Sequence, residues 1–238
     1  MENNSLGKLY LIPTTLGDNE PLEVLPISIK RTIENINFFI VENEKTARRF
    51  IKKISSKKSQ SDLHLEALNK FTEPEMIPTF LQPCLEGKDV GVISEAGCPG
   101  IADPGADVVR IAHEKNIKVV PLVGPSSILL ALMASGLNGQ NFAFNGYLPI
   151  ESGERRGALK RLEKLSRDSN QSQLFIETPY RNDKLFAELC KTLHAATKVC
   201  VACDLTLPTE FIATKTVKEW SNETIDLHKR PTIFILQG

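Results

Sequence analysis

The chain has 238 residues, of which 41% are hydrophobic and 24% are charged, a composition typical of a globular protein with one large or two small domains. Lysine plus arginine number 29, as do aspartate plus glutamate, so the formal net charge is zero. This balance excludes a nucleic-acid binder that is basic over its whole surface, but it allows a local basic face.

Apolar strand-like runs alternate with helical patterns through the first half of the chain. The runs are KLYLIPT (8–14), FFIVE (38–42), DVGVIS (89–94) and IKVVPLV (117–123), and the helical patterns include 45–58 and 103–116. Alternation of this kind predicts a parallel sheet with helices on its faces.

A further helix is predicted at SSILLALMASGL (126–137), where serines suit the start and Gly136 suits the end. This segment is apolar nearly all round, which predicts a helix that is buried on most of its sides.

The second half has a different pattern, with five strand-like runs and only two helical patterns between them, at 155–167 and 181–195. The runs KVCVACDL (198–205) and EFIATKTV (210–217), joined by TLPT, predict a hairpin and therefore a mixed sheet. The fold class is thus α/β with two α/β domains. We expect a domain of residues 1–122 with a mostly parallel sheet and a domain of residues 123–238 with a mixed sheet.

No apolar run approaches the ~20 residues needed to cross a bilayer, and the start of the chain is unlike a signal peptide. The five cysteines lack the spacing of a disulfide framework, and the four histidines lack the spacing of a metal site. Cys200 and Cys203 lie in a β-branched run and are predicted to be buried. We therefore expect a cytoplasmic protein that contacts no membrane and binds no metal.

Four predicted strand ends carry loops rich in glycine or proline: PTTLGD (13–18), SEAGCPGIADPG (94–105), PLVGPSS (121–127) and GYLP (146–149). In open α/β sheets, ligands bind outside the carboxyl ends of the strands, and glycine lets backbone groups approach them closely. The phosphate-binding pattern GxxxxGK[ST] is missing, and no GxGxxG follows the first strand. A ligand bound by backbone groups and apolar walls, such as adenine with a methionine-like tail, fits these loops better than a polyphosphate.

The segments LYLIPTTLGD, SEAGCPGIADPG, VVPLVGPSSILLALMASGL, FAFNGYLP and FIETPYR resemble, in order, the tetrapyrrole methylase superfamily of S-adenosylmethionine-dependent methyltransferases. Within it the chain is most similar to the small-subunit (16S) rRNA ribose 2′-O-methyltransferase I family. The resemblance implies two α/β domains with the cofactor S-adenosyl-L-methionine in the cleft between them, a homodimer, and ribosomal RNA or the small ribosomal subunit as partner.

The resemblance also implies which residues lie against the cofactor, mainly in the strand-end loops. They are Pro13, Thr14, Gly17, Ser94, Gly97, Asp103, Gly105, Val123, Gly124, Ser126, Ser127, Leu148, Pro149 and Thr232.

The chain departs from the ribosomal RNA branch where that branch has an EDTRHT-like block. Here the residues are ENEKTA (42–47), which retain Glu42 but neither the aspartate nor the arginine–histidine pair. The departure concerns RNA recognition more than cofactor binding. Two alternatives therefore stay open: a methyltransferase of a tetrapyrrole or other small molecule, and a catalytically silent cofactor-binding regulatory protein.

Methyl transfer to a ribose hydroxyl requires a group that removes a proton, and carboxylates near the predicted pocket are the candidates. The predicted catalytic residues are Glu95, Glu42 and Asp103. A competing role exists for Asp103, because an aspartate before Pro104 is well suited to cap the N-terminus of the following helix.

Two helical patterns have basic faces that suit phosphate contacts, although a solvated surface is the competing interpretation. In 45–58 the packing residues are predicted to be Ala47, Phe50, Ile51 and Ile54, and in 153–165 they are predicted to be Ala158, Leu159, Leu162 and Leu165. Tyr180 in ETPYR either stacks a base or packs half-buried. The predicted RNA contacts are Arg48, Arg49, Lys52, Lys53, Arg155, Arg156 and Arg181.

Overall fold

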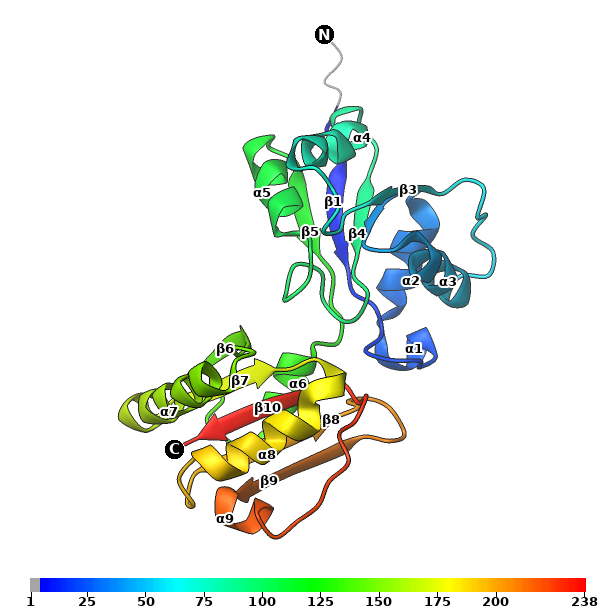
Figure 1. Cartoon of the computed structure of the whole chain (residues 1–238). Coiled ribbons are helices and arrows are strands. Elements are labelled where there is room, and N and C mark those ends of the chain that lie inside the picture. Colours follow the sequence, from blue (N-terminus) through cyan, green and yellow to red (C-terminus); the bar gives the residue numbers. More distant parts are fainter. Residues whose placement is uncertain (1–4) are drawn as a thin grey trace. The chain divides into compact units, whose positions relative to one another are not determined.

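The apolar runs of the first half form one parallel sheet in the computed structural model, which describes residues 5–238 (Figure 1). Its strands are β1 (Lys8–Ile12), β2 (Phe38–Val41), β3 (His64–Ala67), β4 (Val90–Ile93) and β5 (Lys118–Pro121), in the order β3-β2-β4-β1-β5. Val90 pairs with Leu9 on one side and with Phe38 on the other, so β4 lies inside the sheet and is buried at every position. The sequence analysis missed β3, because His64–Ala67 has no apolar run and pairs only at the edge of the sheet.

Helices cover both faces of this sheet. On one face lie α1 (Pro21–Val24), α2 (Ile27–Asn35) and α3 (Glu44–Ile54), and on the other lie η1 (Pro74–Leu81), α4 (Gln82–Leu85) and α5 (Ala106–Glu114). Neighbouring residues of a strand point to opposite faces, so Phe39 packs with the first group and Ile40 with the second. The predicted packing stripe of α3 is confirmed, since Ala47, Ile51 and Ile54 are buried.

The chain divides into two compact units between Ser126 and Ser127, inside the PLVGPSS segment. The second unit has a mixed sheet with the order β6-β7-β10-β8-β9. Its strands are β6 (Phe142–Tyr147), β7 (Ser172–Ile176), β8 (Lys198–Cys203), β9 (Phe211–Thr216) and β10 (Thr232–Gln237). β6 and β7 are parallel, and the remaining pairs are antiparallel, which confirms the predicted hairpin of β8 and β9 and the mixed sheet. Cys200 and Cys203 on β8 are buried, as predicted.

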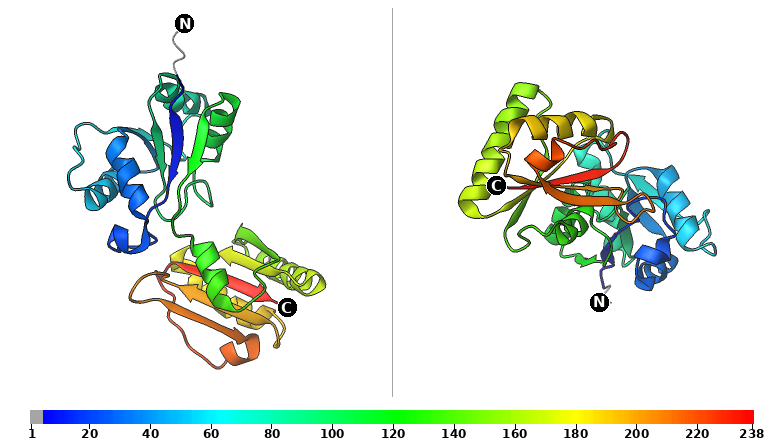
Figure 2. Two further views of the ribbon diagram at one scale, coloured as in Figure 1. Left: turned by 180° about the vertical axis from the view of Figure 1, so that it is seen from behind. Right: turned by 90° about the horizontal axis from the view of Figure 1, so that it is seen from below.

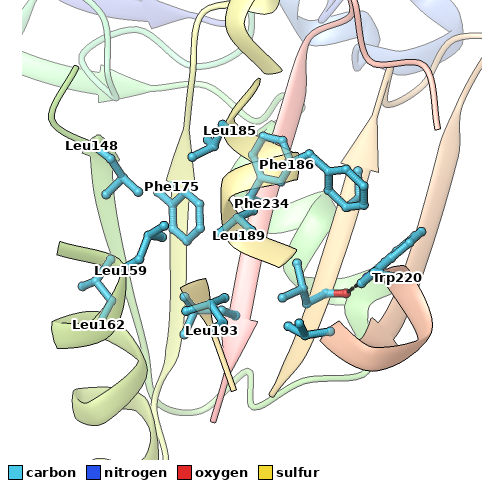
Figure 3. Packing of buried hydrophobic residues seen from close by; sticks show 14 of the residues in the cluster. Leu148, Leu159, Leu162, Phe175, Leu185, Phe186, Leu189, Leu193, Trp220 and Phe234 are labelled. Atoms are coloured by element: carbon cyan, nitrogen blue, oxygen red, sulfur yellow. Dashed lines mark hydrogen bonds between the residues drawn. The ribbon is translucent and has the colours of Figure 1, made fainter. Parts of the chain in front are cut away.

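One face of the second sheet is covered by α7 (Ser152–Ser169), α8 (Asn182–Thr192) and α9 (Val217–Trp220), and a short 3-10 turn, η2 (Pro179–Arg181), precedes α8. Leucines and aromatic rings of these helices pack against Phe175 and Phe234 of the strands (Figure 3). The indole Nε1 of Trp220 donates to the carbonyl of Val199 at 2.8 Å, so this buried ring keeps its polar atom satisfied.

The helix α6 (Ser127–Ser135) lies on the opposite face of the second sheet (Figure 2). Ala131 and Leu132 are buried, but Leu129 is exposed and Met133 is 79% exposed. The prediction of a helix buried on most sides is therefore wrong. A helix that lies on one face of a sheet buries one side only, and hydrophobicity all round does not say which side that is.

Among residues 5–238 no helix has the length and apolar character that crossing a bilayer requires. Nor does that part of the chain contain a group of three or more histidine, cysteine, aspartate or glutamate residues arranged to hold a metal ion.

Candidate active site

The carboxyl ends of the parallel strands bring three of the predicted loops together at one edge of the first sheet. The backbone NH of Thr14, after β1, donates to the carbonyl of Gly97, after β4, at 2.9 Å. The hydroxyl of Ser94 donates to the same carbonyl at 2.6 Å. The loop after β5 joins them, since the thiol of Cys98 donates to the carbonyl of Pro125 at 3.4 Å. Three loops that are far apart in the sequence therefore form one hydrogen-bonded surface.

Two glycines of these loops are required by contacts between the loops themselves. A Cβ at Gly124 would lie 2.2 Å from Cβ of Pro13, which is far inside contact distance. At Gly97 the backbone has φ 75°, and a Cβ would lie 3.1 Å from the side chain of Leu16. The sequence predicts that these glycines allow close approach of a ligand, and in the structure they also let the loops approach one another.

A cavity of about 490 Å³, here called the strand-end cavity, lies between α3 and the loops that follow β1 and β4. Its lining consists of Thr14, Thr15, Leu16, Gly17, Asp18, Asn19, Pro21, Thr46, Ala47, Arg49, Phe50, Lys53, Ile93, Ser94 and Glu95. The volume is in the usual range for small-molecule sites. The lining combines apolar walls, such as Leu16 and Ile93, with both acidic and basic groups, so it suits a ligand that is partly charged and partly apolar.

The structure separates the four predicted basic contacts of α3 into two kinds. Lys53 lies 2.9 Å from Asp18 and 3.4 Å from Glu20, and its hydrogen bond to Asp18 raises the pKa of the ammonium group. Arg48 donates to the carbonyl of Gln60 at 2.9 Å. Both side chains thus hold neighbouring loops.

Arg49 and Lys52, in contrast, are exposed, and neither side chain has a hydrogen bond or ion pair with any residue in the described range 5–238. Arg49 also lines the strand-end cavity. Of the predicted α3 contacts, these two have guanidinium and ammonium groups that are free to bind a phosphate.

The structure brings the three candidate carboxylates close enough to influence one another. Asp103 and Glu42 line a common recess between the ends of β2 and β4. Burial, and then the charge and hydrogen bond of Glu42 and the charge of Glu95, raise the pKa of Asp103 to about 7. Glu95 in turn accepts a hydrogen bond of 2.5 Å from the hydroxyl of Thr46, a residue that the sequence analysis did not consider as part of the site.

Asp103 does not cap a helix, so that interpretation of the sequence is wrong. The helix α5 begins at Ala106, and Gly105, with φ 135°, occupies the N-cap position without a side-chain hydrogen bond. Only glycine adopts this backbone conformation readily, which is why the helix begins after Gly105 and not at Pro104. The carboxyl group of Asp103 is therefore left for the interaction with Glu42.

In the second unit the predicted cofactor residues gather at one end of the sheet. Leu148 and Pro149 follow the end of β6, and Thr232 begins β10. Tyr147 pairs with Ile176, which pairs with Ile233, so the three strands bring these positions to the same end.

Arg155 on α7 was predicted to contact RNA, and this prediction is wrong. Its side chain is 2% exposed and forms an ion pair with Glu188 of α8. Nη1 also donates to the carbonyl of Ile150 at 2.9 Å, so Arg155 holds the segment that follows Pro149. A residue in this position determines the course of the loop and cannot reach a partner.

The inward face of α7 agrees with the prediction at Ala158, Leu159 and Leu162, which are buried, and differs from it at Leu165. Leu165 is exposed, whereas Glu163 and Ser166 are buried. Glu163 is satisfied there because it accepts hydrogen bonds from the backbone of His194 and the hydroxyl of Thr197. Periodicity of leucines could not reveal a buried acid whose partners come from another segment.

The remaining predicted RNA contacts differ in accessibility. The side chain of Arg156 is 60% exposed and lies 3.9 Å from Glu188. Arg181 is occupied by Glu177, whose carboxylate accepts from its Nη2 at 2.7 Å.

The family model that describes tetrapyrrole (corrin/porphyrin) methylases matches residues 8–220 of the chain. The chain belongs to this family. Members of the family use S-adenosyl-L-methionine, and the protein is a methyltransferase that depends on it.

Curated relatives cover nearly the whole chain. Ribosomal RNA small subunit methyltransferase I of Escherichia coli O157:H7 is 29% identical over 239 residues, which are 99% of this chain and 79% of that protein. The protein of the same name from Vibrio cholerae is 27% identical over 99% of this chain and 78% of its own length.

Solved structures confirm the fold at lower identity. The methyltransferase CobJ has a TM-score of 0.65 and 15% identity, with 98% of this chain and 94% of that chain covered. Cobalt precorrin-4 methyltransferase CbiF has a TM-score of 0.61 and 17% identity, with 100% and 97% covered. The α/β architecture with one parallel and one mixed sheet is thus that of the tetrapyrrole methylases.

The residues of the strand-end cavity fit S-adenosylmethionine. The carboxylate of Glu95 suits a ligand with an ammonium group and ribose hydroxyls, and Leu16 and Phe50 suit an adenine ring. When bound, the cofactor supplies an electrophilic methyl group on a positively charged sulfur. Thr14 and Ser94, which link the β1 and β4 loops, are the residues that we propose hold it.

The contact between Gly124 and Pro13 gives a test of the loop assembly. Gly124→Ala is expected to raise the Kd for S-adenosylhomocysteine by about tenfold or more, the equivalent of about 1.4 kcal/mol, because the added Cβ pushes the β1 and β5 loops apart. Titration calorimetry measures the Kd, with circular dichroism to verify folding. Gly139→Ala is the matched control, since a Cβ there has no neighbour within 4 Å. Equal affinities of a folded Gly124→Ala variant and the parent would contradict the proposed site.

Proposed function

We propose that the protein methylates a ribose 2′-hydroxyl of small-subunit ribosomal RNA, acting in the cytoplasm. The names of the relatives, which match 99% of the chain, support an RNA substrate. The observation that carries the chemistry is the carboxyl group of Asp103, which has a pKa of about 7 and lies beside Glu42 at the strand ends. A group that titrates near neutral pH is well suited to accept a proton during the reaction.

In this proposal each residue of the site has a separate role. Asp103 accepts the proton that the ribose oxygen loses, and its burial, together with the charges of Glu42 and Glu95, raises its pKa to about 7. Thr46 orients Glu95 through its hydroxyl. Arg49, at the wall of the cavity, holds a phosphate of the acceptor strand and thereby positions the hydroxyl.

We also propose that the protein is a homodimer. The exposed apolar side chains of α6, above all Met133, offer surface that a second copy can cover.

The direct test is methyl incorporation from tritiated S-adenosylmethionine into unmodified small-subunit rRNA, both free and assembled into small subunits. We expect label in the RNA that survives alkaline hydrolysis as a dinucleotide, because a methylated 2′-oxygen cannot attack the neighbouring phosphate. Label only in a tetrapyrrole, or in no acceptor at all, would exclude RNA methylation.

The exposed basic residues of α3 allow a separate test of RNA binding. The double variant Arg49→Gln, Lys52→Gln is expected to flatten the plot of log affinity for the rRNA against log salt by about 1.4 to 1.8 units, two phosphate contacts being lost. Filter binding across salt concentrations measures this slope. Lys115→Gln with Lys118→Gln is the charge-matched control, since Lys118 begins β5 at the opposite end of the sheet. If both double variants have the same salt slope, Arg49 and Lys52 do not contact the RNA and belong to a solvated surface.

A further inference from the structure

The side chain of Tyr180 stands out on the second unit because it is 70% exposed, so the interpretation as half-buried packing is wrong. Two residues from the segment before β10 flank it. The ring of His228 makes an edge contact, with centroids 6.0 Å apart and planes at 80°. The ammonium group of Lys229 lies 5.6 Å from the centroid of the tyrosine ring. We call Tyr180, His228 and Lys229 the aromatic platform.

One backbone and one side-chain hydrogen bond hold the two halves of the aromatic platform together. The NH of Lys229 donates to the carbonyl of Pro179 at 3.0 Å, and the side chain of Asn182 donates to the carbonyl of Arg230 at 2.6 Å. Lys229 has φ 61°, a left-handed conformation that is costly for lysine and that these bonds maintain. The two backbone segments that carry the rings are therefore held in place before any partner binds, which reduces the conformational entropy lost on binding.

Arg230 anchors the same segment from the other side. Its guanidinium donates to Asp204 at 2.7 Å and to the carbonyl of Thr209 at 2.6 Å. Because Arg181 is likewise engaged by Glu177, neither arginine is available to a ligand. Lys229 and His228, both exposed, are basic side chains that remain beside the exposed ring of Tyr180.

The aromatic platform lies near the predicted cofactor residues of the second unit. η2 follows the carboxyl end of β7, and Lys229 precedes Thr232, which begins β10. The platform thus lies at the same end of the second sheet as Leu148 and Pro149. An acceptor strand that reaches this end of the sheet meets the tyrosine ring.

We propose that the aromatic platform binds an unpaired base of the RNA acceptor, with the base stacked on Tyr180 and its phosphate beside Lys229. An exposed aromatic face next to a cation is the arrangement that binds single-stranded RNA, because every base has a face to stack and every nucleotide a phosphate to neutralise. This inference rests on the proposed function, since it specifies how the same RNA is held.

The test compares Tyr180→Ala with Tyr180→Phe in filter binding of an unpaired rRNA fragment and in methyl transfer. Loss of the ring is expected to raise the Kd by about 5- to 150-fold, and the effect on methyl transfer is expected mainly in KM. Phenylalanine keeps the stacking face and is expected to bind nearly as the parent does. Lys229→Gln is expected to flatten the salt slope by about 0.7 units, whereas Lys198→Gln, at the opposite end of the sheet, leaves it unchanged.

The outcomes separate this inference from the proposed function. If the parent methylates RNA and Tyr180→Ala binds the fragment equally well, the platform inference fails while the function stands. If Tyr180→Ala weakens methylation of assembled subunits but not binding of free RNA, the platform contacts a ribosomal protein and the inference is overturned. A parent that neither binds nor methylates RNA contradicts both.

Discussion

Replacement of Asp103 by asparagine is expected to reduce methyl transfer by about 10²- to 10⁴-fold, the usual contribution of a general base. The amide keeps the shape of the side chain and can still donate a hydrogen bond to Glu42, but it cannot accept the proton of the ribose hydroxyl. Initial rates of methyl incorporation into the rRNA measure the loss. Asp107→Asn is the matched control, because Asp107 is exposed on α5 and, within residues 5–238, forms its ion pair with Arg110.

The pH dependence follows from the pKa of about 7 for Asp103. The parent is expected to gain activity as the pH rises through about 7, since only the ionised carboxylate accepts a proton. Glu42→Gln removes a neighbouring negative charge, so it is expected to shift this acid limb to lower pH. An unshifted limb in Glu42→Gln, or full activity of Asp103→Asn, would show that Asp103 is not the base; loss of activity in Glu95→Gln instead would point to Glu95.

The pH dependence of stability provides an independent measure of the raised pKa of Asp103. A carboxyl group whose pKa is raised on folding binds its proton more tightly in the folded state, so its stabilising contribution is lost as the pH rises from about 4 through about 7. Asp103→Asn removes this dependence. Its melting temperature is expected to approach that of the parent at pH 4 and to exceed it at pH 8, although the variant transfers methyl groups far more slowly.

Arg155→Met is expected to destabilise the second unit by about 3–5 kcal/mol, because the change leaves Glu188 nearly buried without its main partner. Burial opposes ionisation of Glu188, but hydrogen bonds from Ser152 and Arg155 hold the pKa of this carboxyl below its ordinary value. The unpaired carboxylate must therefore be desolvated at a cost or take up a proton. Urea unfolding followed by circular dichroism measures the difference.

Two further variants make this prediction specific. Arg156→Met changes the neighbouring, largely exposed arginine and is expected to cost no more than about 1 kcal/mol. Arg155→Met combined with Glu188→Gln removes both charges and is expected to recover part of the loss. Equal stabilities of Arg155→Met and Arg156→Met would mean that the buried ion pair does not hold α7 and α8 together.

Local patterns in the sequence were sufficient for the framework of the fold. The apolar runs predicted four of the five strands of the first sheet and the hairpin of β8 and β9, because burial on both faces of a strand requires a continuous apolar stretch. The edge strand β3 and the helix α2 were missed, since a strand at the edge of a sheet needs no such stretch and the sequence analysis identified no pattern for α2.

The strand-end loops were also predictable, together with the family that their motifs indicate. The structural role of the glycines in these loops was not predictable. Gly124 permits contact with Pro13, a residue far away in the sequence, and the residues next to Gly124 in the chain do not indicate this contact.

The tertiary structure alone decided which charged side chains are buried and which groups they pair with. Arg155 and Arg156 are adjacent and chemically identical, yet one is buried against Glu188 and the other is exposed. Burial raises the pKa of Asp103 most, and the next contribution comes from Glu42, which follows a different strand. Helical periodicity tells which side of an element faces inward, but whether a charge on that side is tolerated depends on the partner that another element supplies. The energy of a charge is set by the groups around it in space, and the sequence by itself determined only the elements that carry those groups.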